Sequence, residues 1–111
     1  MKNIYIKHIA SRLQVKEWQV ENCAALFEEG ATIPFISRYR KERTGGLDEV
    51  AVAEIRHFTD VFAEMEKRKQ TILETIEAAG ALTPELSGRI QASVDSRELE
   101  DLYLPYKPKR R

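Results

Sequence analysis

The sequence predicts an all-α protein, and three features of its 111 residues lead to this prediction. Apolar residues recur at steps of three and four along most of the chain, which is the period of one helix face. Cap residues and glycines separate these stretches where helices are expected to begin and end. No two alternating β-rich stretches are joined by a hairpin turn, so a β-sheet is not expected.

The longest predicted element is a helix over residues 47–80. Its apolar positions form one stripe that only Lys69 interrupts: Ile55, Phe58, Phe62, Met65, Ile72, Ile76 and Ala79. The spacing tightens towards the heptad seam of a coiled coil. At about 1.5 Å per residue the rod would be roughly 48 Å long, more than a compact domain of this size spans. We therefore expect the helix to kink, to pair with a second copy, or to belong to a larger protein.

Local signals mark both ends of this helix. Asp48 is the expected N-cap, and Leu47 and Val52 have the spacing of a hydrophobic staple. Gly80 provides the stop, because glycine adopts the left-handed cap conformation without a steric cost.

Three helices are predicted before the long one: 4–13, 17–29, and a short helix that begins at Thr32 and ends at Thr44-Gly45-Gly46. Pro34 fits the first turn of the third helix, where its missing N–H costs nothing. Residues 4–6 are also compatible with a short strand. Trp18 is expected to anchor the core. The lengths and short connections resemble a helix-turn-helix trio, a shape that by itself says little about DNA.

Short helices are predicted after the long one. Thr83 and Pro84 form a cap-and-proline start, followed by an apolar line of Leu86, Ile90 and Val94. Ser96 is the expected cap of a last turn, and Pro105 and Pro108 then favour an extended path. The predicted organisation is a helical trio over 1–46, a central helix over 47–80, and short helices with a basic tail over 81–111.

The composition bounds the class of protein. A hydrophobic content of 42% suits a modest core, and the 18 Lys and Arg balance 18 Asp and Glu. Any attraction to nucleic acid must therefore come from local patches. Cys23 is the only cysteine, which suits a reducing cytosol. Neither a signal peptide nor an apolar stretch of about 18 residues is found. We expect a soluble cytoplasmic protein without a membrane partner.

No catalytic constellation is found, so we predict that the chain is not an enzyme and holds no metal or cofactor. His8 and His57 lie on different predicted helices and lack metal-ligand spacing. Cys23 lies in an apolar stripe, which favours an inert core thiol over a nucleophile. Gly45-Gly46 lacks the remaining residues of a phosphate-binding loop.

The first of two basic clusters spans residues 38–43 and carries four cations and one carboxylate, a net charge of +3. On a helix, Phe35, Ile36 and Tyr39 share one face, Arg38 and Arg40 flank it, and Lys41 points away. The arginines either lay their stems over the core and pair with carboxylates, or form a ridge that contacts phosphates. Both interpretations stay open at this point, with a lean towards a stabilising role for Arg38.

The second cluster spans residues 103–111 and places four cations among its last five residues. Its candidate binding residues are Tyr106, Lys107, Lys109, Arg110 and Arg111. Tyrosines among cations suit single-stranded nucleic acid, whose bases stack and whose phosphates are neutralised. The alternative is a connector that crosses the surface of a larger protein. The charge run stops abruptly at Arg111, so we expect the chain to be a fragment.

Two stretches of the chain resemble the Tex family. The first is Glu29-Gly30-Ala31-Thr32-Ile33-Pro34-Phe35-Ile36-Ser37-Arg38-Tyr39-Arg40-Lys41-Glu42, continuing to Thr44-Gly45-Gly46-Leu47-Asp48-Glu49. The second is Leu99-Glu100-Asp101-Leu102-Tyr103-Leu104-Pro105-Tyr106-Lys107-Pro108-Lys109-Arg110-Arg111. Both are long, ungapped and in the expected order, and the match covers essentially the whole chain as the N-terminal region of the family. Ile33 and Ser37 replace a usual valine and alanine.

The resemblance implies a bacterial cytoplasmic transcription accessory protein that binds nucleic acid. Members of this family are elongated and mostly helical, and they begin with a helix-turn-helix-like region. Their ribonuclease-H-like domain, helix-hairpin-helix segment and RNA-binding OB-fold lie outside this chain. The basic residues of both clusters fall within the family pattern, which alone does not make them nucleic-acid contacts.

Two hypotheses follow for the function. The chain is either a module that adds basic contacts to nucleic acid, or a scaffold whose long helix organises the remaining domains of a larger protein. Binding by the first route should be weak, indifferent to base sequence, and salt-dependent with a log–log slope of roughly −2 to −3. The long apolar stripe is expected to be too long for the remaining helices to cover fully, which predicts a homodimer at high concentration.

Overall fold

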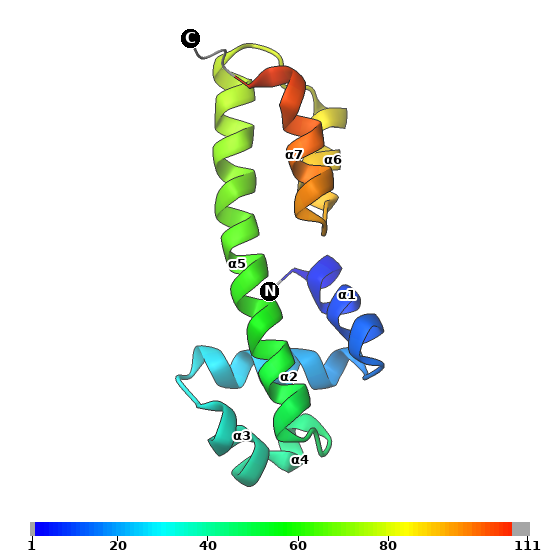
Figure 1. The fold of residues 1–111 in the computed structure, drawn as a ribbon, viewed down its shortest axis with the longest axis vertical. Helices are drawn as coiled ribbons and strands as arrows, with labels where there is room; N and C mark the ends of the chain where they lie inside the picture. The colour runs from blue at the N-terminus through cyan, green and yellow to red at the C-terminus, as the bar shows by residue number, and fades with distance from the viewer. Residues whose placement is uncertain (1, 108–111) are drawn as a thin grey trace. The chain divides into compact units, whose positions relative to one another are not determined.

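A computed structural model describes residues 2–107 of the chain (Figure 1), and all of its regular elements are helical. The elements are α1 (Asn3–Leu13), α2 (Glu17–Glu28), α3 (Ile33–Tyr39), α4 (Lys41–Thr44), α5 (Glu49–Ala78), α6 (Pro84–Ala92), α7 (Ser96–Tyr103) and the 3₁₀ turn η1 (Leu104–Tyr106). The all-α prediction is therefore confirmed for residues 2–107, and the strand alternative at residues 4–6 is not realised.

The chain folds as two compact units that divide within α5. The first unit runs to Phe62 and the second begins at Ala63, so each unit contains one half of the long helix. Each half needs its own covering helices, because a helix within a protein gains most of its stability from the packing of its apolar face.

The N-terminal unit packs α1 to α4 around the first half of α5. In Figure 1, α2 runs across this half, with α3 and α4 beyond it. The Tyr5 ring of α1 stacks on the Phe62 ring of α5, with centroids 4.3 Å apart. The fully buried side chains include Ile9, Val20, Cys23, Ile36, Val52 and Ile55. The apolar core is therefore assembled from α1, α2, α3 and the first half of α5, and α4 adds the buried Thr44.

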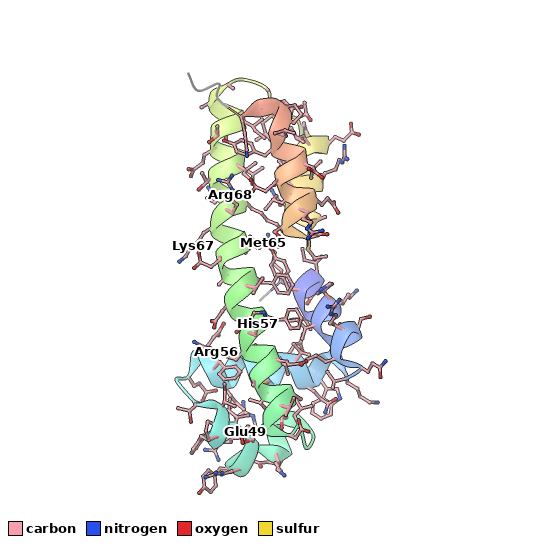
Figure 2. The ribbon with its side chains drawn as sticks, viewed as in Figure 1. Glu49, Arg56, His57, Met65, Lys67 and Arg68 are labelled. Carbon is pink, nitrogen blue, oxygen red and sulfur yellow. The ribbon has the colours of Figure 1, made fainter. Side chains whose placement is uncertain are left out.

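The C-terminal unit packs α6 and α7 against the second half of α5. Its buried apolar side chains come from all three helices and include Ile72, Ile76, Leu86, Ile90, Leu99 and Tyr103. Lys69 lies among them with only 1% of its surface exposed. Figure 2 shows Lys67, two residues before it, on the outer side of α5. The interruption of the apolar stripe at Lys69 is thus a buried lysine and not an exposed one.

The ends of α5 follow the local signals. The Asp48 carboxylate accepts a hydrogen bond from the Ala51 N–H at 2.8 Å, which makes Asp48 the N-cap as predicted. Leu47 and Val52 are both buried. At the other end, Gly80 has a φ of +71°, and the next N–H bonds back to the Ile76 carbonyl.

The apolar stripe of α5 is covered within the chain. Five of its seven members are at most 6% exposed: Ile55, Phe62, Met65, Ile72 and Ile76. Phe58 is half-buried, and Ala79, beyond the last residue of α5, is exposed. The expectation that the other helices cannot cover this stripe is therefore wrong. The prediction of a homodimer through α5 depended on an uncovered stripe, and no described feature of α5 supports it.

Three local expectations also need correction. The expected third helix is two helices, because the backbone leaves the helical conformation at Arg40 (φ −129°, ψ 30°) between α3 and α4. The N-cap of α7 is Asp95, whose carboxylate accepts from the Arg97 N–H at 2.8 Å, and Ser96 is the first helical residue. Pro105 lies within the turn η1 and not in an extended segment, since proline is compatible with the first turn of a helix.

Trp18 is not the buried anchor that the sequence predicts. It remains 46% exposed, and its ring edge packs against the backbone at Gly45. The apolar positions of α2 that enter the core are Val20, Cys23, Leu26 and Phe27. Trp18 lies outside this set, so its ring covers the end of α4 instead of filling the centre of the unit.

Candidate nucleic-acid interface

The first basic cluster is built on two short helices joined at a single residue. The Thr32 hydroxyl caps α3 by accepting from the Phe35 N–H at 3.3 Å, and Pro34 occupies the first turn. The chain then breaks at Arg40 and forms α4. The break at Arg40 therefore divides the cluster between two helices, with Arg38 on α3 and Lys41 on α4.

Two polar side chains of α2 anchor the end of α4. The Gln19 side-chain amide donates to the Thr44 carbonyl at 2.9 Å, and the Asn22 amide donates to the Arg43 carbonyl at 2.8 Å. These residues are three apart on α2 and therefore lie on one face. They satisfy carbonyls that the end of a helix leaves without an internal partner. The end of α4 is thus held through its backbone carbonyls, and this anchoring uses none of the charged side chains of the basic cluster.

Gly45 permits the close approach that this anchoring needs. Its φ is +69°, and a Cβ placed there would lie 2.6 Å from both the Gln19 amide nitrogen and the Trp18 ring. Any side chain would therefore combine a left-handed backbone with an overlap against α2. The neighbouring Gly46 also has a positive φ of +86° but faces open space.

The four cations of the first cluster differ in the contacts that their side chains make. Arg38 and Lys41 are exposed, and neither forms an ion pair with any described residue. Arg43 approaches Glu29 only at 4.0 Å, with both side chains exposed. Arg40 packs its guanidinium over the Phe35 ring at 4.8 Å and donates to the Tyr39 carbonyl at 3.0 Å. The interpretation that Arg38 pairs with a carboxylate over the core finds no support among residues 2–107.

Two aromatic rings lie exposed beside these cations. Phe35 is 39% exposed and Tyr39 is 62% exposed, whereas Ile36 is fully buried. The sequence pattern places all three on one face of the helix. This is wrong for the two rings, which are exposed while Ile36 is buried. The seven residues of α3 bury Ile36 and Ser37 against the unit, and Phe35 and Tyr39 at i and i+4 form a second face outside. The signal for this outer face is the arginine on either side of Tyr39.

In the second cluster, the described cation Lys107 makes contacts within its own unit. Lys107 lies 3.6 Å from the Glu100 carboxylate and 5.7 Å from the centre of the Tyr103 ring. Tyr106 is half-buried. Glu100 of α7 thus engages the ammonium of Lys107, seven residues later in the chain. Lys109, Arg110 and Arg111 lie outside the described residues, so their role stays a prediction.

Glu100 is also the partner of Arg68 on α5. The guanidinium donates two hydrogen bonds to the carboxylate, Nε to Oε2 at 2.8 Å and Nη2 to Oε1 at 2.9 Å. These hydrogen bonds from Arg68, with the nearby positive charges of Arg68 and Lys107, hold the pKa of Glu100 below its ordinary value, although partial burial opposes this. The same pair of hydrogen bonds raises the pKa of Arg68.

Lys69 is a third cation of this unit, and its buried ammonium forms hydrogen bonds within the fold. Its ammonium donates to the carbonyls of Gln91 at 2.9 Å and Ser93 at 2.6 Å, at the C-terminal end of α6. A cation at this end of a helix meets the carbonyls that the last turn leaves without a partner. The sequence shows only a lysine in an apolar stripe, and the partner carbonyls are more than 20 positions away.

Reactive groups are sparse in the described part of the chain. Cys23 is buried, and burial raises the pKa of its thiol to about 11, which leaves it protonated and weakly nucleophilic at neutral pH. Among residues 2–107 no group of three or more His, Cys, Asp or Glu side chains is placed to hold a metal ion. None of the described helices is long and apolar enough to span a membrane.

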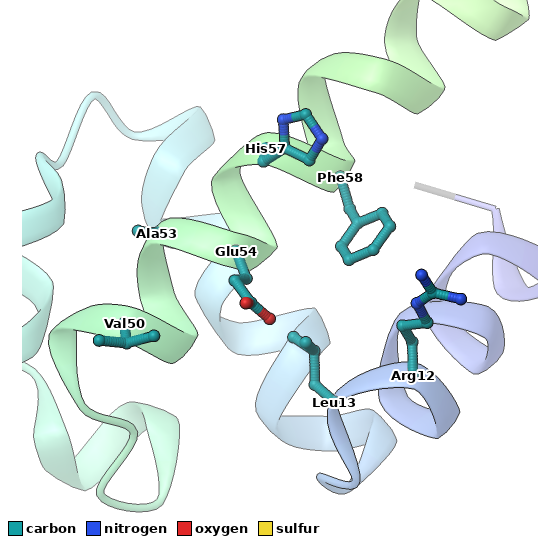
Figure 3. Close-up of a pocket in the computed structure, with 7 residues that line it drawn as sticks. All are labelled: Arg12, Leu13, Val50, Ala53, Glu54, His57 and Phe58. Carbon is teal, nitrogen blue, oxygen red and sulfur yellow. The ribbon is translucent and has the colours of Figure 1, made fainter.

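One open hollow lies on the N-terminal unit, between the end of α1 and the start of α5 (Figure 3). Its volume is about 780 Å³. Four apolar residues line it, Leu13, Val50, Ala53 and Phe58, together with the charged or polar residues Arg12, Glu54 and His57. Val50 is 69% exposed there. Such a shallow apolar surface suits contact with another polypeptide better than with a small ligand.

The family of the chain follows from comparison with known proteins. Residues 3–77 match the family described as the Tex-like protein N-terminal domain. The chain belongs to the Tex family. The matched range takes in α1 to α4 and nearly all of α5. It therefore includes the α3–α4 surface, which consists of the exposed residues Phe35, Arg38, Tyr39 and Lys41.

Curated relatives extend the match along the chain. Protein YhgF of Escherichia coli (strain K12) is 45% identical over the entire chain, and the Transcriptional accessory protein Tex of Neisseria gonorrhoeae is 43% identical over 93% of it. The chain spans only 14% of the length of each of these proteins. The S1 RNA-binding domain-containing protein 1 of Homo sapiens is 28% identical over 92% of the chain, which corresponds to 10% of that protein.

Proposed function

We propose that this chain is the N-terminal helical module of a cytoplasmic transcription accessory protein, and that it contacts nucleic acid phosphates through α3 and α4. The observation that carries the proposal is the pair of exposed cations, Arg38 and Lys41, which have no ion-pair partner among residues 2–107. Arg and Lys side chains in this state are the groups that neutralise phosphates. The role is one of binding and not of catalysis.

The names of two relatives agree with this proposal. One is a transcriptional accessory protein and another carries an S1 RNA-binding domain, while this chain spans a small part of either. The contribution proposed here is therefore an auxiliary one. It should be indifferent to base sequence, because α3 carries no Asn or Gln to read base edges. Whether the N-terminal helices act as a helix-turn-helix stays a prediction.

The salt dependence of binding tests the phosphate contacts. The affinity for a labelled single-stranded RNA is measured by fluorescence anisotropy over a series of salt concentrations starting at about 50 mM, where electrostatic binding is strongest. The double variant Arg38→Ala, Lys41→Ala should flatten the log–log slope by about 1.4, since each phosphate contact to a single strand contributes about 0.7. A slope that does not change in this variant contradicts the proposal.

A matched control removes the same charge elsewhere. Lys67 and Arg97 are exposed cations of the C-terminal unit, so the double variant Lys67→Ala, Arg97→Ala changes the net charge equally. It should leave the slope almost unchanged. An equal effect of both double variants would mean that total charge, and not the α3–α4 surface, determines binding.

The alternative function is a scaffold or protein-interaction module. The hollow between α1 and α5 favours it, because Val50 and Phe58 expose apolar surface there. The same binding experiment distinguishes the two functions. No measurable affinity for single-stranded RNA or DNA at about 50 mM salt would leave the scaffold as the remaining hypothesis.

A further inference from the structure

The outer face of α3 carries two aromatic rings that form one surface. The ring centroids of Phe35 and Tyr39 lie 5.4 Å apart, with their planes tilted by 49°. Both rings stay substantially exposed, and Tyr39 is the more exposed of the two. The fold buries Ile36 and Ser37 on the other side of this helix, so the core does not use the aromatic pair.

Arg40 packs against one ring of this pair and bonds to the backbone at the other. Its guanidinium carbon lies 4.8 Å from the Phe35 centroid, and its Nη1 donates to the Tyr39 carbonyl at 3.0 Å. Phe35 is thereby in contact with Tyr39 and with Arg40, and its freedom is reduced before any ligand arrives. A surface that is ordered in advance loses less conformational entropy on binding. The Tyr39 ring is left as the outermost flat surface.

The charges around the rings define the kind of ligand. Arg38 lies next to Tyr39 in sequence and one helical turn from Phe35, and Lys41 begins α4 directly after the break. Neither has an ion-pair partner among the described residues. The surface therefore suits an anion that also carries flat aromatic groups. A nucleic acid strand with unpaired bases has both features, whereas an acidic peptide supplies only the charge.

We propose that Phe35 and Tyr39 form a stacking platform for an unpaired base, while Arg38 and Lys41 contact the phosphates beside it. This inference rests on the proposed nucleic-acid contact and adds the class of ligand, a single strand. A duplex hides its base faces within the stack, so only unpaired bases present them to a tyrosine ring. Stacking is tolerant of sequence because every base has a flat face.

The variant Tyr39→Leu tests the platform. It removes the ring but keeps every charge, and the exposure of Tyr39 predicts that the fold is retained. The affinity for a single-stranded RNA should fall by about 5- to 150-fold, the range that base–aromatic stacking supports. The affinity for a duplex of the same sequence and the log–log salt slope should both remain unchanged. Tyr39→Trp, which keeps a flat ring, should bind the single strand as well as the natural chain or better.

Further measurements separate the outcomes. Wild-type affinity for single strand in Tyr39→Leu would overturn the platform, while the Arg38 and Lys41 variants would still decide the phosphate contacts. An equal loss for duplex, or for an abasic oligonucleotide, would also overturn it, because neither offers a free base. Competition by polyglutamate that is equally sensitive to Tyr39→Leu would assign the surface to an acidic peptide instead.

A direct measurement covers the case in which Tyr39→Leu alters the fold. In the natural chain, nuclear Overhauser effects between the Tyr39 ring protons and RNA base protons are expected at saturation. Effects seen only to ribose protons, or none at all in a formed complex, would contradict stacking.

Discussion

Two sets of cations, one in each unit, use the same residue types in opposite ways. In the N-terminal unit, Arg38 and Lys41 are exposed and have no ion-pair partner among residues 2–107. In the C-terminal unit, Arg68, Lys69 and Lys107 all meet acceptors of the same unit. Each of these five residues contributes the same single positive charge to the net charge of the chain. Their availability to a ligand is decided by the acceptors that the fold places beside them.

The difference has a structural origin in each unit. The end of α4 is anchored through backbone carbonyls by Gln19 and Asn22, which need no charge from the basic cluster. In the second unit, the cations themselves join the helices: Arg68 links α5 to α7, and Lys69 links α5 to the end of α6. Cations that are part of the packing are poor candidates for an external phosphate, because binding would break an internal contact.

The largest effect is expected from Lys69→Met. Methionine keeps the apolar stem but leaves the Gln91 and Ser93 carbonyls without the ammonium donor, at a cost of about 3–4 kcal/mol in the free energy of unfolding. Urea denaturation measures the change. Lys67→Met is the matched control, because Lys67 is exposed, and should change the free energy by less than about 0.5 kcal/mol. Equal effects of the two variants would remove Lys69 from the packing argument.

Gly45→Ala tests the close approach between α2 and the end of α4 in the N-terminal unit. The added methyl group would meet the Gln19 amide and the Trp18 ring at 2.6 Å, in addition to the strain of a positive φ. We expect a loss of about 2–3 kcal/mol in the free energy of unfolding. Gly46→Ala has the strain without the overlap, and should cost about 1 kcal/mol. If the two variants melt at the same temperature, the close approach between α2 and the end of α4 is not a determinant of stability.

A smaller effect is expected from Glu100→Gln. The carboxylate is partly exposed, so the loss of its paired geometry with Arg68 should cost only about 0.5–1 kcal/mol near neutral pH. Because the folded state lowers the pKa of Glu100 from 4.5, its contribution to stability is fully present above that value. The contribution is lost as the pH falls through the lowered pKa.

The acid dependence provides the check on that prediction. The difference in unfolding free energy between Glu100→Gln and the natural chain should shrink as the pH drops below 4.5. A difference that stays constant with pH would assign the loss to packing and not to the charge of Glu100.

The sequence predicts well those features that depend on neighbouring residues. The caps at Thr32, Asp48 and Thr83 each accept the expected backbone hydrogen bond, since cap and donor are three residues apart. The order of the helices and the end of α5 follow from the same local signals. The break at Arg40 escapes them, because it depends on how α2 anchors the end of α4.

Features that depend on distant partners could not be predicted. Trp18 stays half-exposed because the end of α4, and not the core, lies beside it. Lys69 finds its acceptors only once α6 is packed on α5. In the candidate interface, both basic clusters could be located from the sequence. Which of their cations are engaged could not, because Lys107 pairs with a carboxylate seven residues away through the geometry of α7 and η1.

The most direct test of this account compares Arg38→Ala with Lys107→Ala. Each variant removes one cation from one basic cluster, and each is examined for binding of single-stranded RNA across salt concentrations. Arg38→Ala should flatten the log–log slope by about 0.7, equivalent to one lost phosphate contact, with an unchanged melting temperature. Lys107→Ala should leave the slope as it is, because Glu100 already engages that ammonium. A flattened slope in Lys107→Ala together with an unchanged slope in Arg38→Ala would contradict the account.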